Sequence, residues 1–353
     1  MELHRARRIL LCLRYGIGDV VMEAPAVEAL SKSNPHARLT LLGASPALEL
    51  FRDRPEIDRL ERIGRWGLRH WGDPGTERQR EAIRRWLAQQ AFDLVLDPSH
   101  AVIAVREVLR AGEARLLDAG EFHQCEALHL GLRSTGAVNE AVRRGWGLSV
   151  AVDESWKLPV PEAREAWAEG FLRRLGPAFA RPLGVSAVGS SHLKRWPARR
   201  LAQVADRLAE ENGCGVLVFA GRQCREAQAV IEAMRRHDRL ALVGAMHLQR
   251  IAALLGRCRL FLGNDTGLMH LAAARRTPVV AVFGPTCPEV YLPQVPAALA
   301  LQGATFCPHR RRDAFGPPAC LVEDRCLRSG GSGCIDEIPA AEVLACGRRL
   351  LNS

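Results

Sequence analysis

The stretch FLGNDTGLMHLAAARRTPVVAVFG, residues 261–284, has the form of a strand, a helix and a second strand. Its first apolar run ends in Asn264 and Asp265, a helical pattern covers 267–275, and a valine-rich apolar run fills 278–284. Short apolar runs that alternate with helices are typical of a parallel β-sheet. The stretch therefore predicts a βαβ unit of an α/β fold.

The turn between this strand and this helix is either a helix cap or an anion site. As the N-cap, Asp265 would accept hydrogen bonds from the amides of Gly267 or Leu268. Alternatively, the free amides of Thr266, Gly267 and Leu268 bind a phosphate together with the positive end of the helix dipole. His270 lies about one turn into the helix, where it is either an interior histidine or a neighbour of the same anion. Both interpretations remain open at this point.

The same alternation of strands and helices continues outward through both halves of the chain. In the second half, the sequence predicts strands at 183–189, 215–221, 240–244, 259–264 and 278–284, and helices near 198–211, 224–236, 247–256 and 267–275. In the first half, it predicts strands at 8–14, 38–43, 60–64, 92–97 and 114–119, and helices near 20–32, 45–53, 76–90 and 101–111.

These patterns indicate two Rossmann-like, doubly wound domains. We expect an N-terminal domain over 1–160, a connection over 161–182 that carries one amphipathic helix among prolines, and a C-terminal domain over 183–353 that ends in a helix at about 339–351. Ligands of open α/β sheets bind at the carboxyl ends of the strands. We therefore expect the active site in a central cleft that the two domains face.

The composition is typical of a globular protein, and the net charge is positive. Of its 353 residues, 48% are hydrophobic and 25% are charged, and the net charge of +10 rests on 46 arginines and three lysines. This charge attracts phosphates, anionic headgroups or nucleic acid, although an arginine-rich coding bias explains the scarcity of lysine better. Apolar runs stay well short of the roughly 20 residues that span a bilayer, and the first residues are too charged for a signal peptide. We expect a cytoplasmic protein.

Several common chemistries lack their motifs in this sequence. Asp-x-Asp, the Walker loop and Gly-x-Ser-x-Gly do not occur, which disfavours metal-chelating glycosyltransferases, P-loop enzymes and the usual α/β-hydrolases. A helix suited to reading bases and an aromatic platform are also missing, so nucleic acid is not an expected partner. Gly16 and Gly18 resemble a dinucleotide fingerprint, but Val21 stands where its third glycine belongs, which disfavours a nicotinamide site.

Two further turns at strand ends carry polar side chains. Asp19 follows the first strand, where it either caps a helix or serves as a base. Ser190, Ser191 and Lys194 follow the first strand of the second half, and Lys194 is either a solvated surface residue or a counter-charge for a phosphate.

The eleven cysteines are mostly spread through predicted core segments, which is typical of reduced thiols. Cys307, Cys320, Cys326 and Cys334 fall close together in the tail, but no Cys-x-x-Cys pair is present. The spacing is unlike that of common zinc ribbons. A structural metal or cluster site, free thiols and a local disulfide all remain open, and free thiols or a disulfide are favoured.

Taken together, these stretches resemble glycosyltransferase family 9, the ADP-heptose:lipopolysaccharide heptosyltransferases. The resemblance runs nearly end to end and rests on GIGDVVMEAP (16–25), KRWP (194–197), VFAGRQCRE (218–226), GNDTGLMHLAAARRTPVVAVFGPTCP (263–288) and the cysteine-bearing tail. It implies a GT-B fold and an inverting transfer of heptose from ADP-heptose to the lipopolysaccharide inner core, with no required metal or other cofactor.

The resemblance also implies roles for individual residues. Asp19 would deprotonate the acceptor hydroxyl, with Gly18 beside it on the acceptor side, and Lys194 would neutralise the departing diphosphate. The donor-binding residues would be Ser190, Ser191, Glu226, Asp265, Thr266, Gly267 and His270. Glu226 would bind the ribose of the donor, although GRQCRE departs from the usual local sequence.

Two alternatives to this function stay open. Some relatives modify protein adhesins and carry cysteine-bound iron, so the acceptor could be a protein or another polysaccharide. The chain could also be a nucleotide-sugar-binding or metal-binding module without transfer activity. The leading interpretation has the nucleotide-sugar donor and the lipopolysaccharide core as partners and places the protein in the cytoplasm, in peripheral contact with the cytosolic face of the inner membrane.

Overall fold

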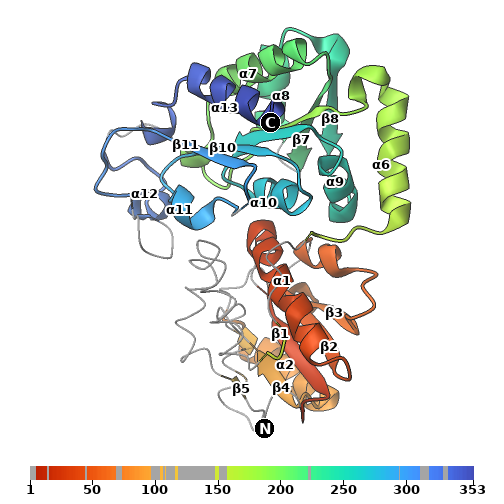
Figure 1. Cartoon of the computed structure of the whole chain (residues 1–353). Helices are drawn as coiled ribbons and strands as arrows, with labels where there is room; N and C mark the ends of the chain where they lie inside the picture. Colours follow the sequence, from red (N-terminus) through yellow and green to blue (C-terminus); the bar gives the residue numbers. More distant parts are fainter. Residues whose placement is uncertain are drawn as a thin grey trace. The chain divides into compact units, whose positions relative to one another are not determined.

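The computed structural model of the chain divides into two compact units, Met1–Trp156 and Lys157–Ser353 (Figure 1). The residues described are 5–13, 16–43, 46–68, 74–96, 104–105, 108, 116–117, 148–150, 157–221, 224–293, 295–310, 318–328 and 333–353.

The described part of the first unit is built on a parallel sheet with the strand order β3-β2-β1-β4-β5. Its central strand β1 has a neighbouring strand on each side and is buried beyond its first residue. The strands are β1 (Arg8–Cys12), β2 (Arg38–Gly43), β3 (Arg59–Arg62), β4 (Leu94–Leu96) and β5 (Leu116–Leu117).

Helix α1 (Ile17–Ser33) follows β1 after a short turn. The Gly16 N–H donates to Asp19 Oδ2 at 3.2 Å, so the Asp19 carboxylate closes the first turn of the helix. Pro25 lies inside α1, well past the first turn, because the helix begins earlier than the predicted residue 20.

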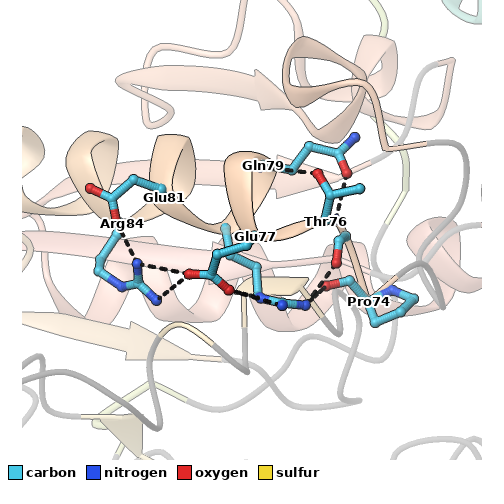
Figure 2. Close-up of polar contacts among 8 residues, drawn as sticks. Pro74, Thr76, Glu77, Gln79, Glu81 and Arg84 are labelled. Atoms are coloured by element: carbon cyan, nitrogen blue, oxygen red, sulfur yellow. Dashed lines mark hydrogen bonds and ion pairs between the residues drawn. The ribbon is translucent and has the colours of Figure 1, made fainter.

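Helix α2 (Glu77–Gln90) begins with a reciprocal pair of caps that Figure 2 shows. The Gln79 N–H donates to Thr76 Oγ1 at 3.3 Å, and the Thr76 N–H donates to Gln79 Oε1 at 2.7 Å. Glu77 in the first turn pairs with Arg80 at 2.9 Å and with Arg84 at 3.5 Å. This start is the capping box that a Thr-x-x-Gln sequence favours.

The second unit is built on a larger parallel sheet with the order β11-β10-β9-β6-β7-β8. Its strands are β6 (Leu183–Ser186), β7 (Val216–Gly221), β8 (Leu240–Gly244), β9 (Leu260–Asn264), β10 (Val279–Phe283) and β11 (Ala298–Gln302). Its helices are α6 (Glu162–Leu175), α7 (Ala198–Glu211), α8 (Cys224–Ala233), α9 (Leu248–Leu255), α10 (Gly267–Ala274), α11 (Pro288–Tyr291), α12 (Ala319–Val322) and α13 (Ala340–Leu351).

Helices cover both faces of this second sheet (Figure 1). Helices α7, α8 and α13 pack together and share one apolar core with alternate residues of β6, β7, β9 and β10. Helices α9 and α10 lie on the other face, and α6 packs on α9. The middle strands β9 and β10 are fully buried, because helices cover them above and below.

A buried arginine at the end of α10 ties α6 to the rest of the second unit. Arg275 Nη1 donates to Leu158 O at 2.6 Å, and its Nη2 forms an ion pair with Glu165 of α6. The Leu158 N–H donates to Ala274 O at 2.9 Å. The segment that was predicted to connect the domains thus lies against α9 and α10.

The two sheets have the strand orders of doubly wound folds, which confirms the predicted α/β class. The order of a sheet reverses between β1 and β4 in the first unit and between β6 and β9 in the second. Ligands of such sheets bind outside the carboxyl ends of the strands at this reversal. The segments that follow β1, β6 and β9 are therefore the expected ligand-binding segments.

Local details differ from the sequence predictions. The segment predicted as a helix near 45–53 forms the 3₁₀ helix η2 (Ala47–Phe51), and the predicted helix near 101–111 lies mostly outside the described residues. The other 3₁₀ helices are η3 (Ile63–Trp66), η5 (Pro177–Phe179), η6 (His192–Lys194), η7 (His237–Arg239) and η8 (Gly333–Ile335). Every helix among the described residues is too short or too polar to cross a membrane.

Candidate functional site

The donor-side residues of the second unit meet at the reversal point between β6 and β9. The chain leaves β6 at Ser186 and reaches η6, which ends in Lys194. It leaves β9 at Asn264 and passes Asp265 and Thr266 into α10. Because β6 and β9 are parallel neighbours, both exits lie at the same edge of the sheet.

Asn264 joins these two exits with its side-chain amide. Its Nδ2 donates to Ala187 O at 2.9 Å and to Val188 O at 3.2 Å, and its Oδ1 accepts from the Trp196 N–H at 3.1 Å. The residue is fully buried, and its bonds to Trp196 and Ala187 are buried as well. Asn264 therefore fixes the segment that carries Lys194 against the end of β9.

A buried ion pair follows directly from this arrangement. Lys194 Nζ lies 2.7 Å from Asp265 Oδ2, and the side chains are only 13% and 6% exposed. The Thr286 hydroxyl donates to the same oxygen at 2.7 Å. Two chemically different donors thus share one carboxylate oxygen.

The N-terminus of α10 is not capped by Asp265, which corrects that alternative from the sequence. The N-cap residue is Thr266, and its side chain makes no capping bond. Thr266 Oγ1 is buried and has no hydrogen-bond partner. The first amides of a helix also have no acceptor within the helix, so this end presents Thr266, Gly267 and Leu268 to a ligand that carries negative charge.

His270 lies one turn into α10 and is 6% exposed. Burial lowers the pKa of His270 to about 4, with the Lys194 ammonium lowering it further and Asp265 opposing the shift. The imidazole is therefore neutral at physiological pH. It completes a group of Lys194, Asp265, Thr266 and His270 around the start of α10.

The remaining predicted donor residues, Ser190, Ser191 and Glu226, differ in their surroundings. The Ser191 hydroxyl donates to Asp324 Oδ1 at 3.0 Å and accepts from the Leu193 N–H at 3.2 Å, so it caps η6. Ser190 is exposed. Glu226, in the first turn of α8, forms an ion pair with Arg195 at 2.8 Å, next to Lys194 in sequence.

Asp19 and Gly18 occupy the equivalent place in the first unit, after β1. Both are partly exposed in the first turn of α1, and the Asp19 carboxylate takes part in the cap described above. An alanine at position 16 would place its Cβ 2.4 Å from Asp19 Oδ2, so the glycine allows the carboxylate to lie this close to the turn.

The four tail cysteines are buried, and no disulfide joins them within the described part of the chain. Cys320 and Cys326 pack against Leu193 of η6. Burial raises the pKa of the Cys334 thiol, and Arg310 beside it opposes that shift. Within the described ranges, no three His, Cys, Asp or Glu side chains are arranged to hold a metal ion.

Sequence reasoning missed several residues that hold the site together, namely Arg195, Asn264, Thr286 and Gln302. All of them except Gln302 lie within the stretches 194–197 and 263–288 that the sequence singles out. The sequence does not indicate their hydrogen-bond or ion-pair partners. Their contacts join segments that are far apart in the chain, which local patterns do not report.

The chain is similar to known glycosyltransferases. The family described as glycosyltransferase family 9 (heptosyltransferase) matches residues 139–312. Lipopolysaccharide heptosyltransferase 2 of Salmonella typhimurium is 26% identical over 298 residues, which cover 77% of this chain and 81% of that protein.

Solved structures share the fold over the whole chain. A family 9 glycosyltransferase from Veillonella parvula matches with a TM-score of 0.73 and 21% identity, covering 100% of this chain and 98% of that one. The E. coli ADP-heptose lps heptosyltransferase II matches with a TM-score of 0.65 and 19% identity, covering 98% of both chains. These matches confirm the predicted GT-B fold class.

Proposed function

We propose that the chain is a member of glycosyltransferase family 9 and that it transfers heptose from ADP-heptose to a sugar of the lipopolysaccharide inner core. The names of the Salmonella and E. coli relatives support both the donor and the acceptor. The observation that carries the proposal is the buried Lys194–Asp265 pair beside the uncapped start of α10.

The donor diphosphate would bind at the start of α10. The amides of Thr266, Gly267 and Leu268 point out of the helix, and the unpartnered Thr266 hydroxyl lies at the same place. A helix N-terminus favours negative charge by its dipole and by these free donors. Glu226, held by Arg195, would bind a hydroxyl of the ribose.

Lys194 would stabilise the leaving ADP without a metal ion. Negative charge develops on the diphosphate as the bond to the anomeric carbon breaks, and a fixed cation lowers the energy of that state. The Lys194 ammonium and the α10 amides supply positive charge from two sides. His270 stays neutral and adds no further charge to the group.

Asp19 would be the base that takes the proton from the acceptor hydroxyl, with Gly18 beside it. A direct displacement by that hydroxyl inverts the configuration of the anomeric carbon, and a carboxylate near the attacking oxygen removes its proton. Lipopolysaccharide as acceptor would place the enzyme in the cytoplasm at the inner face of the inner membrane.

A transfer assay tests this function. The purified protein is given ADP-heptose and heptose-deficient lipopolysaccharide core, and the release of ADP and the mass of the product are measured. We expect product from ADP-heptose and little from ADP-glucose or UDP-glucose. If the core gains no mass while a protein or another polysaccharide does, that other molecule is the acceptor and the proposed acceptor is wrong.

The same assay tests the base. Asp19→Asn keeps an oxygen for the Gly16 N–H but cannot accept the proton, so transfer should fall by about 10² to 10⁴ while ADP binding is retained. Transfer at the normal rate would remove Asp19 from this role.

A further inference from the structure

The loop after β10 reaches the Lys194–Asp265 pair from a third segment of the chain. This loop consists of Gly284, Pro285 and Thr286. The Thr286 side chain is buried, and its hydroxyl lies 2.7 Å from Asp265 Oδ2. An ionised carboxylate only accepts hydrogen bonds, so beside the Lys194 ammonium the hydroxyl is the donor.

Gln302 holds the backbone of this loop on both sides of Pro285. Its Nε2 donates to Gly284 O and to Thr286 O, each at 2.7 Å. An amide nitrogen has two hydrogens, so both are used. Gln302 ends β11 and pairs in register with Phe283 of β10, which places its side chain beside the loop.

The loop also packs directly on the segment that carries Lys194. A Cβ at position 284 would lie 2.1 Å from Leu193 O, so only glycine fits there without a shift. Lys194 therefore has its backbone next to Gly284 and its ammonium on the carboxylate that Thr286 holds. The loop fixes both ends of this lysine.

The shared carboxylate creates a requirement when an anion arrives. Asp265 is 4% exposed, so water cannot replace a lost partner easily. If the Lys194 ammonium turns toward a diphosphate, the Asp265 carboxylate loses its cation. It then depends on its hydrogen-bond donors, among them the Thr286 hydroxyl. A buried charge left without a hydrogen bond is strongly disfavoured.

We propose that Thr286 is a positioning residue for the transfer reaction: its hydroxyl holds the Asp265 carboxylate in place and keeps it hydrogen-bonded when Lys194 turns to the donor diphosphate. This inference rests on the proposed function for the identity of the anion. The orientation of the pair in the free protein does not depend on that function.

Two substitutions separate the hydroxyl from the shape of the side chain. Thr286→Val keeps the shape and removes the donor, whereas Thr286→Ser keeps the donor. Thr277→Val is the matched control, because Thr277 is also a buried threonine of this unit and its hydroxyl donates to Leu255 O at 2.5 Å. Thr277 precedes β10, whereas Thr286 follows it. Gln302→Met is a second route, because it frees the loop without changing Thr286.

The small number of lysines gives a readout that needs no activity. Lysine labelled with ¹³C at the ε carbon yields signals only from Lys32, Lys157 and Lys194, and Lys194→Arg identifies the third. In the free protein, Thr286→Val and Gln302→Met should move the Lys194 signal. Thr286→Ser should leave it near the wild-type position, and Thr277→Val should leave it unchanged.

Titration with ADP supplies the second readout. A hydrogen bond to a charged group is worth about tenfold or more in an equilibrium constant, so Thr286→Val should weaken ADP binding by about that factor. Thr286→Ser should stay within about twofold of the wild type. In the transfer assay, Thr286→Val should raise KM for the donor and Thr286→Ser should restore it.

The outcomes distinguish this inference from the proposed function. A Thr286→Val protein with the wild-type Lys194 signal and wild-type ADP affinity overturns the inference, even where the wild type transfers heptose. A wild type that transfers no heptose overturns the proposed function, while a displaced Lys194 signal in Thr286→Val still supports the role of the hydroxyl. If Thr286→Val does not fold, an unmoved signal in Gln302→Met overturns the inference.

Discussion

His270 is enclosed at the start of α10, where burial makes its charged form costly. Its pKa is lowered to about 4, from an ordinary value of 6.5. The unfolded chain therefore takes up a proton near pH 6.5, whereas the folded protein takes it up only near pH 4. Between these values protonation favours the unfolded state, so stability falls as the pH falls through this window and changes no further from this residue below pH 4.

The pH dependence of unfolding tests this account of His270. The free energy of unfolding of the wild type is compared with that of His270→Gln by denaturant titration between pH 7 and pH 4. We expect the wild type to lose, relative to the variant, on the order of 3 kcal/mol as the pH is lowered from 6.5 to 4. A difference between the two proteins that stays constant with pH would show that His270 is not held neutral.

The loop after β10 and the 3₁₀ helix η6 show how closely elements approach at the site. Gly284 lies against the backbone of Leu193, and a side chain there has no space. A glycine can therefore be required by a neighbouring backbone even where its own torsion angles are ordinary. The position of Lys194 depends on this contact between elements.

Gly284→Ala should move η6 and with it Lys194. We expect a loss of about 1 to 3 kcal/mol in the free energy of unfolding, as for other overpacked sites, together with weaker ADP binding. Gly244→Ala is the control, because a Cβ at position 244 of β8 would meet no atom within 4 Å. Thermal unfolding that is equal in the two variants would contradict the close contact.

Element types were predictable because their signals are local. Val, Ile and Leu runs followed by helical patterns identified β9, α10 and β10, since buried parallel strands leave this mark in any sequence. The polar turns at strand ends likewise identified Asp19, Lys194 and Asp265 as candidates. The 3₁₀ geometry of η2 was missed, because apolar periodicity does not separate a short 3₁₀ helix from an α-helix.

The contacts among candidates were not predictable from local patterns. The sequence around Asp265 does not indicate that Lys194 and Thr286 contact its carboxylate. It also does not indicate that Gln302 binds the backbone of the loop after β10. These partners come from strands that are neighbours only in the folded sheet. The Asp265 N-cap alternative failed for the same reason, because a tertiary ion pair replaced the local bond.

At the scale of the whole molecule, the proposed donor chemistry lies within one unit. Lys194, Asp265, Thr266, Thr286 and Gln302 all belong to Lys157–Ser353, which has its own sheet and apolar core. Asp19 belongs to the other unit. The proposed donor binding and the proposed proton removal thus fall in separate units of the chain.

The fragment 157–353 should therefore fold and bind ADP alone. We expect a single cooperative unfolding transition by circular dichroism and an ADP affinity by calorimetry that falls when Lys194→Met is introduced. The full-length chain serves as the reference. A fragment that folds but binds no ADP, although the full chain does, would show that the first unit supplies essential donor contacts.

The most direct test of the central claim is the rate of heptose transfer by Lys194→Met, measured beside Lys32→Met. Lys32 is a suitable control because it pairs with Glu28 on the surface of α1 and its side chain is 57% exposed. We predict that Lys194→Met lowers the rate by about 10² to 10³, as the loss of one fixed donor to a leaving group does, while Lys32→Met keeps the wild-type rate. Transfer by Lys194→Met at the wild-type rate would contradict the account.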